Sequence, residues 1–442
     1  MVQLLQLVPT IIEHRQNIKL SRQQLEAKNL KKFRKLVRFA NQRSPFYARI
    51  IRENHINIEH CIPQDFPPLS KTDLLQNFDE IVTNPAITKQ AITHFLSHSK
   101  KPSDLFQNQY YVVHSSGSSG ETGYYVYSSK EWLKGLAHVF KFQPFRLKRR
   151  MTFVGASRGH FAGVTMAMSS QNSIARSFFD LQVLDIAEPI QDLVEKLNHF
   201  QPKTLVSYGS TLRILAEQQQ AGKLKIQPQL IQSSGDALTL QNRLQIQDAF
   251  QAPVFNIYAC SEHLLMGIGY PNAQELVLLE DDLMFDLHAD HICITNLYNY
   301  TMPLIRYKML DQLVLSESTD ALHALPYTRV KNLVGRTEQN LILTNQQGEN
   351  EYINPFVLGG LLIENLKQFQ IKQTSRSQFI FRLQPAPNLS SIQHKQLFQD
   401  VHDALEQMLA EKMLTNVQFS IEEAELLAID PHTGKFKLVV SE

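Results

Sequence analysis

Apolar residues in the first hundred positions recur at the three- and four-residue intervals of an amphipathic helix. The clearest run consists of Leu25, Leu30, Phe33, Leu36, Val37 and Phe39. Ser44-Pro45 interrupts this run, and a new start signal follows at Ser70, a residue type that caps helix N-termini. The pattern predicts that residues 1–100 form a mainly helical lead-in.

The pattern changes from about residue 150, where short apolar runs alternate with amphipathic stretches. Strands are expected at 151–154, 181–186, 204–207, 230–233 and 254–258, and helices at 189–200, 212–219 and 240–250. Strands that alternate with helices of this length indicate βαβ units and a parallel sheet. The predicted fold class is therefore α/β.

Three of these expected strands end in small or polar residues. The first ends at Ser207-Tyr208-Gly209, the second at Ser234-Gly235-Asp236, and the third at Ala259-Cys260-Ser261-Glu262. In open α/β sheets, ligands bind beyond the carboxyl ends of the strands. The three polar ends therefore predict a ligand site along one edge of the sheet.

The last third of the chain lacks the alternation of strands and helices seen before it. Residues 291–315 are expected to form antiparallel strands of a smaller sheet. A separate unit follows, with strands at 379–383 and 417–421 around a helix at 391–410. Gly335-Arg336 is a natural junction, so the predicted domains are residues 1–335 and 336–442.

Composition narrows the function classes. The chain has 442 residues, 19% of them charged, and a formal net charge of +2, which argues against nucleic acid as a partner. No apolar run approaches the ~20 residues that a membrane span needs. The amino terminus lacks the basic region of a signal peptide, so a cytoplasmic location is expected.

The three cysteines, Cys61, Cys260 and Cys293, are far apart in the sequence. There is no Cys-x-x-Cys pair, and no cysteine–histidine spacing suggests a zinc cluster. An odd, sparse set also does not make a disulfide framework. The sequence thus predicts neither a structural metal nor disulfide bonds.

The sharpest local signal is a run rich in serine and glycine between two strand-like segments, 110–113 and 124–127. Its residues are Ser115, Ser116, Gly117, Ser118, Ser119, Gly120, Glu121 and Thr122. Such a loop offers consecutive backbone N–H groups and hydroxyls to phosphate oxygens, and glycine permits their close approach. It is not a Walker A loop, because no Gly-Lys-Ser/Thr follows. A flexible linker is the competing interpretation.

The run at 115–120 resembles the Ser-Ser-Gly-Thr-Thr-Gly loop of the adenylate-forming superfamily, in particular the group of phenylacetate–CoA ligase and coenzyme F390 synthetase. Further segments resemble that group in the same order along nearly the whole chain. They are Ser44–Tyr47, Pro68–Leu74, Asn256–Glu262, Pro303–Asp311, Gly335–Glu338 and Thr433–Lys437. Each match is weak alone, but their shared order makes the resemblance specific.

The resemblance implies a large amino-terminal domain of parallel αβα sheets with a smaller sheet, and a small mobile α+β carboxy-terminal domain. It implies that ATP activates a carboxylic acid, aryl or arylalkyl, as an acyl-AMP with release of pyrophosphate. The acyl group would then pass to a thiol, either coenzyme A or the phosphopantetheine of an acyl carrier protein. A homodimer is compatible with this picture.

The resemblance also implies roles for individual residues. Tyr258 would pack against adenine, Asp311 would accept the ribose hydroxyls, and Glu262 would hold Mg²⁺ on the triphosphate. The competing readings are a core aromatic, a turn aspartate and a helix N-terminal acid. Nucleotide contacts are also expected from Ser115, Ser116, Gly117, Ser118, Ser119, Gly120, Thr122, Ser234, Gly235, Asp236 and Ser261.

Two cations complete the expected site. Lys435 matches the mobile catalytic lysine of the carboxy-terminal domain, where an ammonium stabilises charge that develops in the transition state. Arg336 is assigned to the hinge or to the ribose–phosphate region. A solvated lysine and a structural salt bridge are the alternatives. The acid would lie between the 207–209 and 234–236 strand ends, near the 155–161 loop.

Some positions depart from the family pattern and keep other functions open. Glu121 follows Gly120 where the family commonly has lysine, and Glu338-Gln339 replaces Asp-Asp at the hinge. Met309-Leu310 replaces polar or small residues. Two alternatives therefore remain: an enzyme that delivers the acyl group to a protein or amine, and a non-catalytic nucleotide-binding relative.

Overall fold

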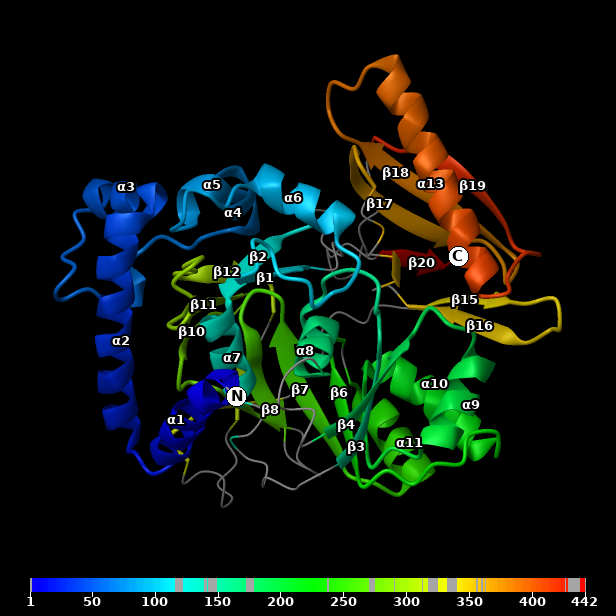
Figure 1. Cartoon of the computed structure of the whole chain (residues 1–442), viewed down its shortest axis with the longest axis horizontal. Helices are drawn as coiled ribbons and strands as arrows, with labels where there is room; N and C mark the ends of the chain where they lie inside the picture. The colour runs from blue at the N-terminus through cyan, green and yellow to red at the C-terminus, as the bar shows by residue number, and fades with distance from the viewer. Residues whose placement is uncertain are drawn as a thin grey trace.

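The structure is a computed structural model, and Figure 1 shows the whole chain. The residues that it describes are 2–115, 122–138, 141, 149–171, 179–236, 238–269, 275–289, 291–311, 313–316, 325–331, 340–354, 357–358, 361, 363–425, 427 and 438–441. A large sheet with its helices occupies the middle of the molecule, and a smaller unit lies at one end. Every structural statement below concerns these residues.

The predicted helical lead-in is confirmed. Its helices are α1 (Val2–Asn17), α2 (Arg22–Arg43), α3 (Pro45–Glu53), α4 (Lys71–Gln76), α5 (Phe78–Ile81) and α6 (Lys89–His98). Ser44 caps α3 by accepting from the backbone N–H of Tyr47. Pro45 is the first residue of α3, a position that suits proline because the N–H that it lacks would have no partner within the helix. Ser70 caps α4 in a reciprocal box with Asp73, as its sequence position predicts.

The central sheet has nine strands and both strand directions. Its strands are β3 (Arg149–Gly155), β4 (Phe179–Asp185), β5 (Thr204–Ser207), β6 (Leu230–Ser234), β7 (Val254–Cys260), β8 (Leu264–Gly269), β9 (Glu275–Leu278), β13 (Val314–Leu315) and β14 (Arg329–Lys331). Their order is β13-β14-β9-β8-β7-β6-β5-β3-β4. The strands from β7 to β4 are parallel, as predicted, and β8, β9, β14 and β13 continue the sheet in antiparallel pairs.

Helices α8 (Ala162–Gln171), α9 (Ile190–Phe200), α10 (Gly209–Gln220) and α11 (Leu240–Phe250) connect the parallel strands. Leucine, isoleucine and valine side chains of α9, α10 and α11 pack on β5, β6 and β7 and form one apolar core. One boundary prediction is wrong. Val314 and Leu315 belong to the large sheet and not to the smaller one, because they pair with β14.

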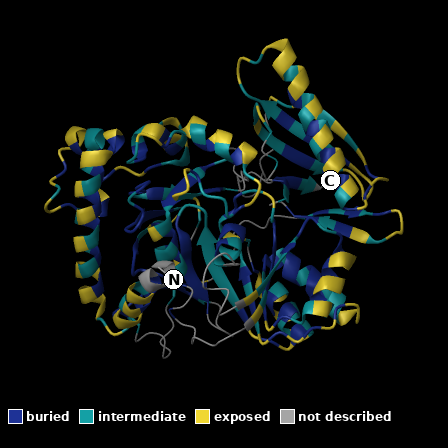
Figure 2. Cartoon of the chain, in the orientation of Figure 1, coloured by how far each residue is buried: buried dark blue, intermediate teal, exposed yellow. Residues whose placement is uncertain are grey.

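A smaller sheet lies between α2 and a β-hairpin (Figure 1). Its strands are β10 (Leu283–Leu287), β11 (Ile292–Asn296) and β12 (Tyr307–Met309). The hairpin consists of β1 (Tyr110–His114) and β2 (Tyr124–Ser128), and α7 (Ser129–Ala137) follows it. Side chains of α2, the hairpin, α7 and the small sheet share a second and larger apolar core, seen as dark blue segments in Figure 2.

The carboxy-terminal unit has its own sheets and its own core. Its elements are β15 (Leu341–Thr344), β16 (Asn350–Ile353), β17 (Leu366–Gln373), β18 (Gln378–Pro385), α13 (Ser391–Glu411), β19 (Gln418–Glu423) and β20 (Val439–Ser441). The four-stranded sheet has the order β19-β18-β17-β20, and α13 packs against it. The predicted junction at Gly335-Arg336 lies outside the described residues.

Polar groups form part of the contact between this unit and the large sheet. Lys412 Nζ donates to the carbonyl oxygen of Glu188 at 2.6 Å and lies 3.7 Å from Glu351 Oε2. Arg158 pairs with Glu411 beside them. Burial lowers the pKa of Lys412 to about 8, although Glu351 acts in the opposite direction. The Lys412–Glu351 pair thus lies within the carboxy-terminal unit, and the contacts to the large sheet are the Lys412–Glu188 hydrogen bond and the Arg158–Glu411 ion pair.

A buried aspartate in the turn between β9 and β10 joins the helices α1, α2 and α7. Asp282 lies 2.8 Å from His14 Nε2 of α1, 2.8 Å from Lys32 Nζ of α2 and 2.8 Å from Lys134 Nζ of α7. Burial alone would raise the pKa of Asp282, but Lys134, Lys32 and His14 outweigh it and hold that pKa well below its usual range. The Asp282 carboxylate thus holds one side chain from each of three helices, α1, α2 and α7.

The buried carboxylate of Glu131, in α7, joins this helix to the residues that follow β11. Its carboxylate accepts from the backbone N–H groups of Ser128, Tyr300 and Thr301 at 2.6, 2.7 and 2.9 Å. Because Glu131→Ala leaves these donors without an acceptor, we expect a loss of about 3 kcal/mol or more in the free energy of unfolding. Urea denaturation measures this loss, and exposed Lys130→Ala is the control. Equal stability of the two variants would contradict the assignment.

Candidate functional site

The predicted polar strand ends meet at one edge of the central sheet. Strands β5, β6 and β7 are neighbours and run parallel, with Ser207 beside Ser233 and Ser234 beside Ile257. The carboxyl ends of the three strands therefore lie side by side. The segments 207–209, 234–236 and 259–262 follow directly from these ends.

The ends of the serine–glycine loop are fixed beside this edge. Ser115 N donates to Gly123 O at 2.9 Å, and Gly123 N donates to Ser115 Oγ at 2.9 Å, so this pair closes the β1–β2 hairpin. Ser261 Oγ donates to the carbonyl oxygen of His114 at 2.8 Å, which joins the hairpin to the end of β7. Thr122 precedes Gly123, and residues 116–121 lie outside the described residues.

Lys71 is a site residue that sequence reasoning missed. Its Nζ lies 3.3 Å from Ser115 Oγ and places a cation at the start of the serine–glycine loop. Lys71 is the first residue of α4, directly after the capping Ser70. The matching segment Pro68–Leu74 contained this lysine, but its position beside the loop depends on tertiary contacts of α4.

Glu262 is held by two tyrosine hydroxyls from β2. Tyr125 of β2 donates to Glu262 Oε1 at 2.9 Å, and its hydroxyl also meets that of Tyr307 in β12 at 3.1 Å. Tyr127 donates to the backbone carbonyls of Ser261 and Glu262 at 2.8 and 2.7 Å. Burial, and then the charge of Glu262, raise the pKa of Tyr125 well above its usual value. The carboxylate is therefore rigidly oriented at the meeting point of β2, β7 and β12.

The structure brings Tyr258 and Asp311 together. Tyr258, in β7, donates its hydroxyl to Asp311 Oδ2 at 2.9 Å, and Asp311 lies two residues after the end of β12. Burial, and then the negative charge of Asp311, raise the pKa of Tyr258 well above its usual value. The tyrosine is consequently a firm hydrogen-bond donor, and the aspartate is held at the end of β7.

Asp236 has a structural partner. Its carboxylate accepts from the backbone N–H groups of Gly209 and Ser210, which are the first residues of α10. Burial raises the pKa of Asp236 against these hydrogen bonds. Gly235 has a φ of +88°, a conformation that glycine adopts without strain, so the chain turns sharply between Ser234 and Asp236. Asp236 therefore fixes the position of the α10 N-terminus at the site edge.

Two buried histidines fix the loop at 155–161 to the hairpin. His160 N donates to His114 Nε2 at 3.1 Å, and His114 N donates to His160 O at 2.9 Å. His160 Nε2 lies 2.8 Å from Ser99 Oγ. Gly159 has a φ of +93°, and a Cβ there would come within 3.0 Å of His114 Nε2. Burial lowers the pKa of each histidine to about 4, so both are neutral at pH 7.

Two expected site residues, Arg336 and Lys435, lie outside the described residues, as do Ser116, Gly117, Ser118, Ser119 and Gly120. Their roles stay predictions. Among the described residues, the structure gathers Ser115, Ser261 and Glu262 at the carboxyl end of β7. It also joins Tyr258, in β7, to Asp311, which follows β12.

The overall fold is that of adenylate-forming ligases, with a large mixed-sheet domain and a smaller sheet domain. A structure titled 2-hydroxyisobutyryl-CoA ligase in complex with 2-HIB-AMP and CoA in the thioesterification state matches with a TM-score of 0.60. The match covers 97% of this chain and 91% of that one, at 16% identity. The same ligase in the postadenylation state with R3-HIB-AMP matches with a TM-score of 0.58, the same coverage and 16% identity.

At the level of sequence, the chain is similar to Protein CapK of Staphylococcus aureus. The two are 23% identical over 331 residues, which cover 70% of this chain and 67% of that protein. No family model matches the chain. None of the helices in the described residues is both long and apolar enough to cross a bilayer.

The buried histidine pair predicts acid sensitivity of the loop at the site edge. His114 and His160 have pKa values of about 4 in the folded chain and an ordinary value of 6.5 when exposed. Between these values the unfolded chain binds more protons, so stability falls as the pH drops from 6.5 towards 4. Each histidine contributes roughly 3 kcal/mol to this loss.

Chemical denaturation at pH 7 and pH 4.5 measures the effect. His114→Gln and His160→Gln are each expected to lose less stability than the wild type between these two pH values. Exposed His94→Gln is the control and should follow the wild type. If all four proteins lose stability equally, the neutral histidine pair is not the cause.

Proposed function

We propose that this protein uses ATP to activate a carboxylic acid as an acyl-AMP and then transfers the acyl group to a thiol. The observation that carries the proposal is the gathering of Ser115, Tyr258, Glu262 and Asp311 at the carboxyl end of β7, in a chain with the fold of acyl-CoA ligases. Ligands bind at this edge in open α/β sheets.

The nucleoside of ATP fits beside Tyr258 and Asp311. The ring of Tyr258 offers a flat apolar surface for adenine. The Asp311 carboxylate accepts one hydrogen bond from Tyr258 and has further lone pairs for the ribose hydroxyls. Ser234 and Gly235, on the neighbouring strand end, and Asp236, which holds α10, would form the adjacent wall.

The triphosphate would lie along the loop 115–122. Backbone N–H groups and hydroxyls of this loop are suited to phosphate oxygens. Lys71 adds a cation at the Ser115 end, which offsets the negative charge of Glu121. Mg²⁺ accompanies ATP as part of the substrate, and Glu262 offers it a hard oxygen ligand that Tyr125 already orients.

In the first step, an oxygen of the carboxylate bonds to the α-phosphorus of ATP while the bond to pyrophosphate breaks. Negative charge grows on the oxygens around that phosphorus. Lys435 would stabilise this charge in the transition state, as a positioned ammonium does. Arg336 would lie at the hinge or near the ribose and phosphates.

The acid would lie beside the ends of β3, β5 and β6. Phe153, Phe161 and Tyr208 cluster there with other apolar side chains. An aromatic lining of this kind suits an aryl or arylalkyl carboxylate, as in the phenylacetate–CoA ligase group.

The acceptor thiol belongs to coenzyme A or to a phosphopantetheine on a carrier protein. The carboxy-terminal unit would rotate about residues 335–336 to admit it. Two other outcomes are separable by experiment: transfer to a protein or amine, and binding of ATP without chemistry. Supplying each acceptor in turn to the acyl-AMP-loaded enzyme and following AMP release distinguishes the acceptors.

The proposal is tested by pyrophosphate release from ATP across panels of aromatic, fatty and amino acids. We expect release that depends on the carboxylic acid and is greatest with an aromatic acid. ATP binding without release for any acid would replace the proposal with a non-catalytic function.

Lys435→Ala is expected to slow exchange of pyrophosphate into ATP by about 100- to 1,000-fold, the usual effect of removing one group that stabilises transition-state charge. ATP affinity should change little, because the stabilised charge appears only in the transition state. Lys437→Ala is the matched control, two residues away. Exchange by Lys435→Ala at the wild-type rate would rule out the role of this lysine.

Lys71→Ala is expected to raise the KM for ATP about tenfold, because a charge-assisted contact with phosphate is lost. Lys71→Arg should restore most of the affinity, since it keeps the positive charge. Steady-state kinetics with varied ATP measure both variants. Exposed Lys89→Ala serves as the control. An unchanged KM in Lys71→Ala would remove this lysine from the nucleotide site.

A further inference from the structure

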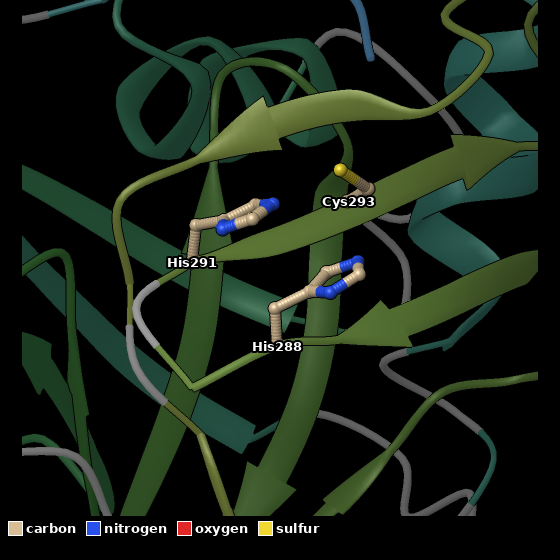
Figure 3. Close-up of side chains that lie close together, drawn as sticks. All are labelled: His288, His291 and Cys293. Carbon is tan, nitrogen blue, oxygen red and sulfur yellow. The ribbon is translucent and has the colours of Figure 1, made fainter. Parts of the chain in front are cut away.

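The hairpin of β10 and β11 places four metal-ligand side chains on one face. Asp286 pairs with Cys293 across the two strands, and the tight turn is closed by a bond from His288 N to His291 O at 3.0 Å. Side chains two residues apart in a strand point to the same face. The spacing Asp-x-His-x-x-His-x-Cys therefore puts all four side chains on the same side of the hairpin. Figure 3 shows the two histidines and the cysteine side by side.

The three softer ligands converge. One ligand atom from each of His288, His291 and Cys293 lies within 4.8 Å of the others. The two imidazole rings are parallel, with centroids 4.4 Å apart and an interplanar angle of 9°. His288 Nε2 lies 3.2 Å from Asp286 Oδ2 without the geometry of a hydrogen bond. The cluster thus has the composition and closeness of a metal site.

We propose that His288, His291 and Cys293 bind a zinc ion, with Asp286 or a water molecule as the fourth ligand. Two imidazoles and one thiolate form a typical ligand set for this cation. The ligand atoms of tetrahedral zinc lie about 3.3–3.8 Å apart. Small side-chain rotations that move the ligand atoms by about 1 Å would therefore complete the site. The His288 side chain is 37% exposed, which gives an ion in solution access to the cluster.

A cation lies beside Cys293. Burial raises the pKa of the Cys293 thiol, and the neighbouring Arg306 acts in the opposite direction without reversing this shift. Zinc binding replaces the thiol proton with a zinc–sulfur bond and releases the proton to solvent. Arg306 also donates to Asp286 Oδ2 at 2.7 Å and to Phe66 O at 2.8 Å, so its own charge is partly balanced.

A second cluster in the described residues, His14, His138 and Asp282, is a weaker candidate. Its carboxylate already contacts Lys32 and Lys134, whose ammonium groups repel a divalent cation. In the hairpin cluster, Asp286 contacts one cation, the guanidinium of Arg306, and the other three ligands are two imidazoles and a thiol. The observations therefore favour the hairpin.

The bound zinc would be structural and separate from the proposed reaction. In the small sheet, Cys293 pairs with Lys308. Tyr307, which precedes Lys308 in β12, points to the opposite face, where it meets Tyr125. The ion and Glu262 consequently lie on opposite faces. Zinc would fix the end of β10–β11 and so stiffen the sheet whose strand β12 leads to Asp311.

The test uses the whole chain after treatment with a chelator, titrated with zinc against a chromophoric competitor. We expect one zinc ion per chain, and a loss of at least about 100-fold in affinity for His291→Ala and for Cys293→Ser. Cobalt(II) in place of zinc should give a thiolate-to-metal charge-transfer band that Cys293→Ser abolishes. His288→Ala, at a partly exposed position, gives the same readout with little risk to folding.

His138→Ala and half-exposed His402→Ala are the controls and should bind zinc as the wild type does. The proposal is overturned if the wild type takes up no zinc. It is equally overturned if the cobalt protein shows no thiolate band, or if binding survives in His288→Ala, His291→Ala and Cys293→Ser. None of these readouts requires ATP or a carboxylic acid, so failure here and failure of the proposed ligase activity are distinguishable.

Discussion

Two tyrosine hydroxyls on β2 hold the end of β7 in place, and the candidate site depends on them. Tyr127 satisfies the carbonyls of residues 261 and 262, and Tyr125 orients the Glu262 carboxylate. Buried polar groups require such partners, so these hydrogen bonds fix the position of the hairpin relative to the end of β7. Because Ser115 and Gly123 follow from the same two strands, these bonds position the ends of the serine–glycine loop together with the Glu262 carboxylate.

Local patterns predicted much of the fold. The strand 204–207 and the helix 240–250 have the bounds that apolar spacing gives them, and Ser70 caps its helix. The antiparallel strands β8 and β9 were not predicted. The residues of β8 form a continuous buried run, without the alternation that identifies a half-exposed strand. Their pairing with β7 is a long-range contact that no local signal contains.

The site was predictable to the same extent. The motifs assign Tyr258 and Asp311 to one nucleotide, by separate roles, and the structure joins the two side chains by a hydrogen bond. Lys71 was not predicted, because a lysine at a helix start is ordinarily solvated and only the fold places it beside Ser115. The His288–His291–Cys293 cluster was also missed. Its spacing matches no common cysteine pair, and the shared face appears only when the turn fixes the strand register.

The contact of the carboxy-terminal unit has a consequence for solution conditions. Two polar contacts cross to the large domain: the ion pair of Arg158 with Glu411, in which the Arg158 side chain is 62% exposed, and the hydrogen bond from buried Lys412 to Glu188 O. Salt screens exposed charges much more than buried ones. Raising the ionic strength therefore weakens the arginine pair at this boundary and leaves the buried lysine bond largely unaffected.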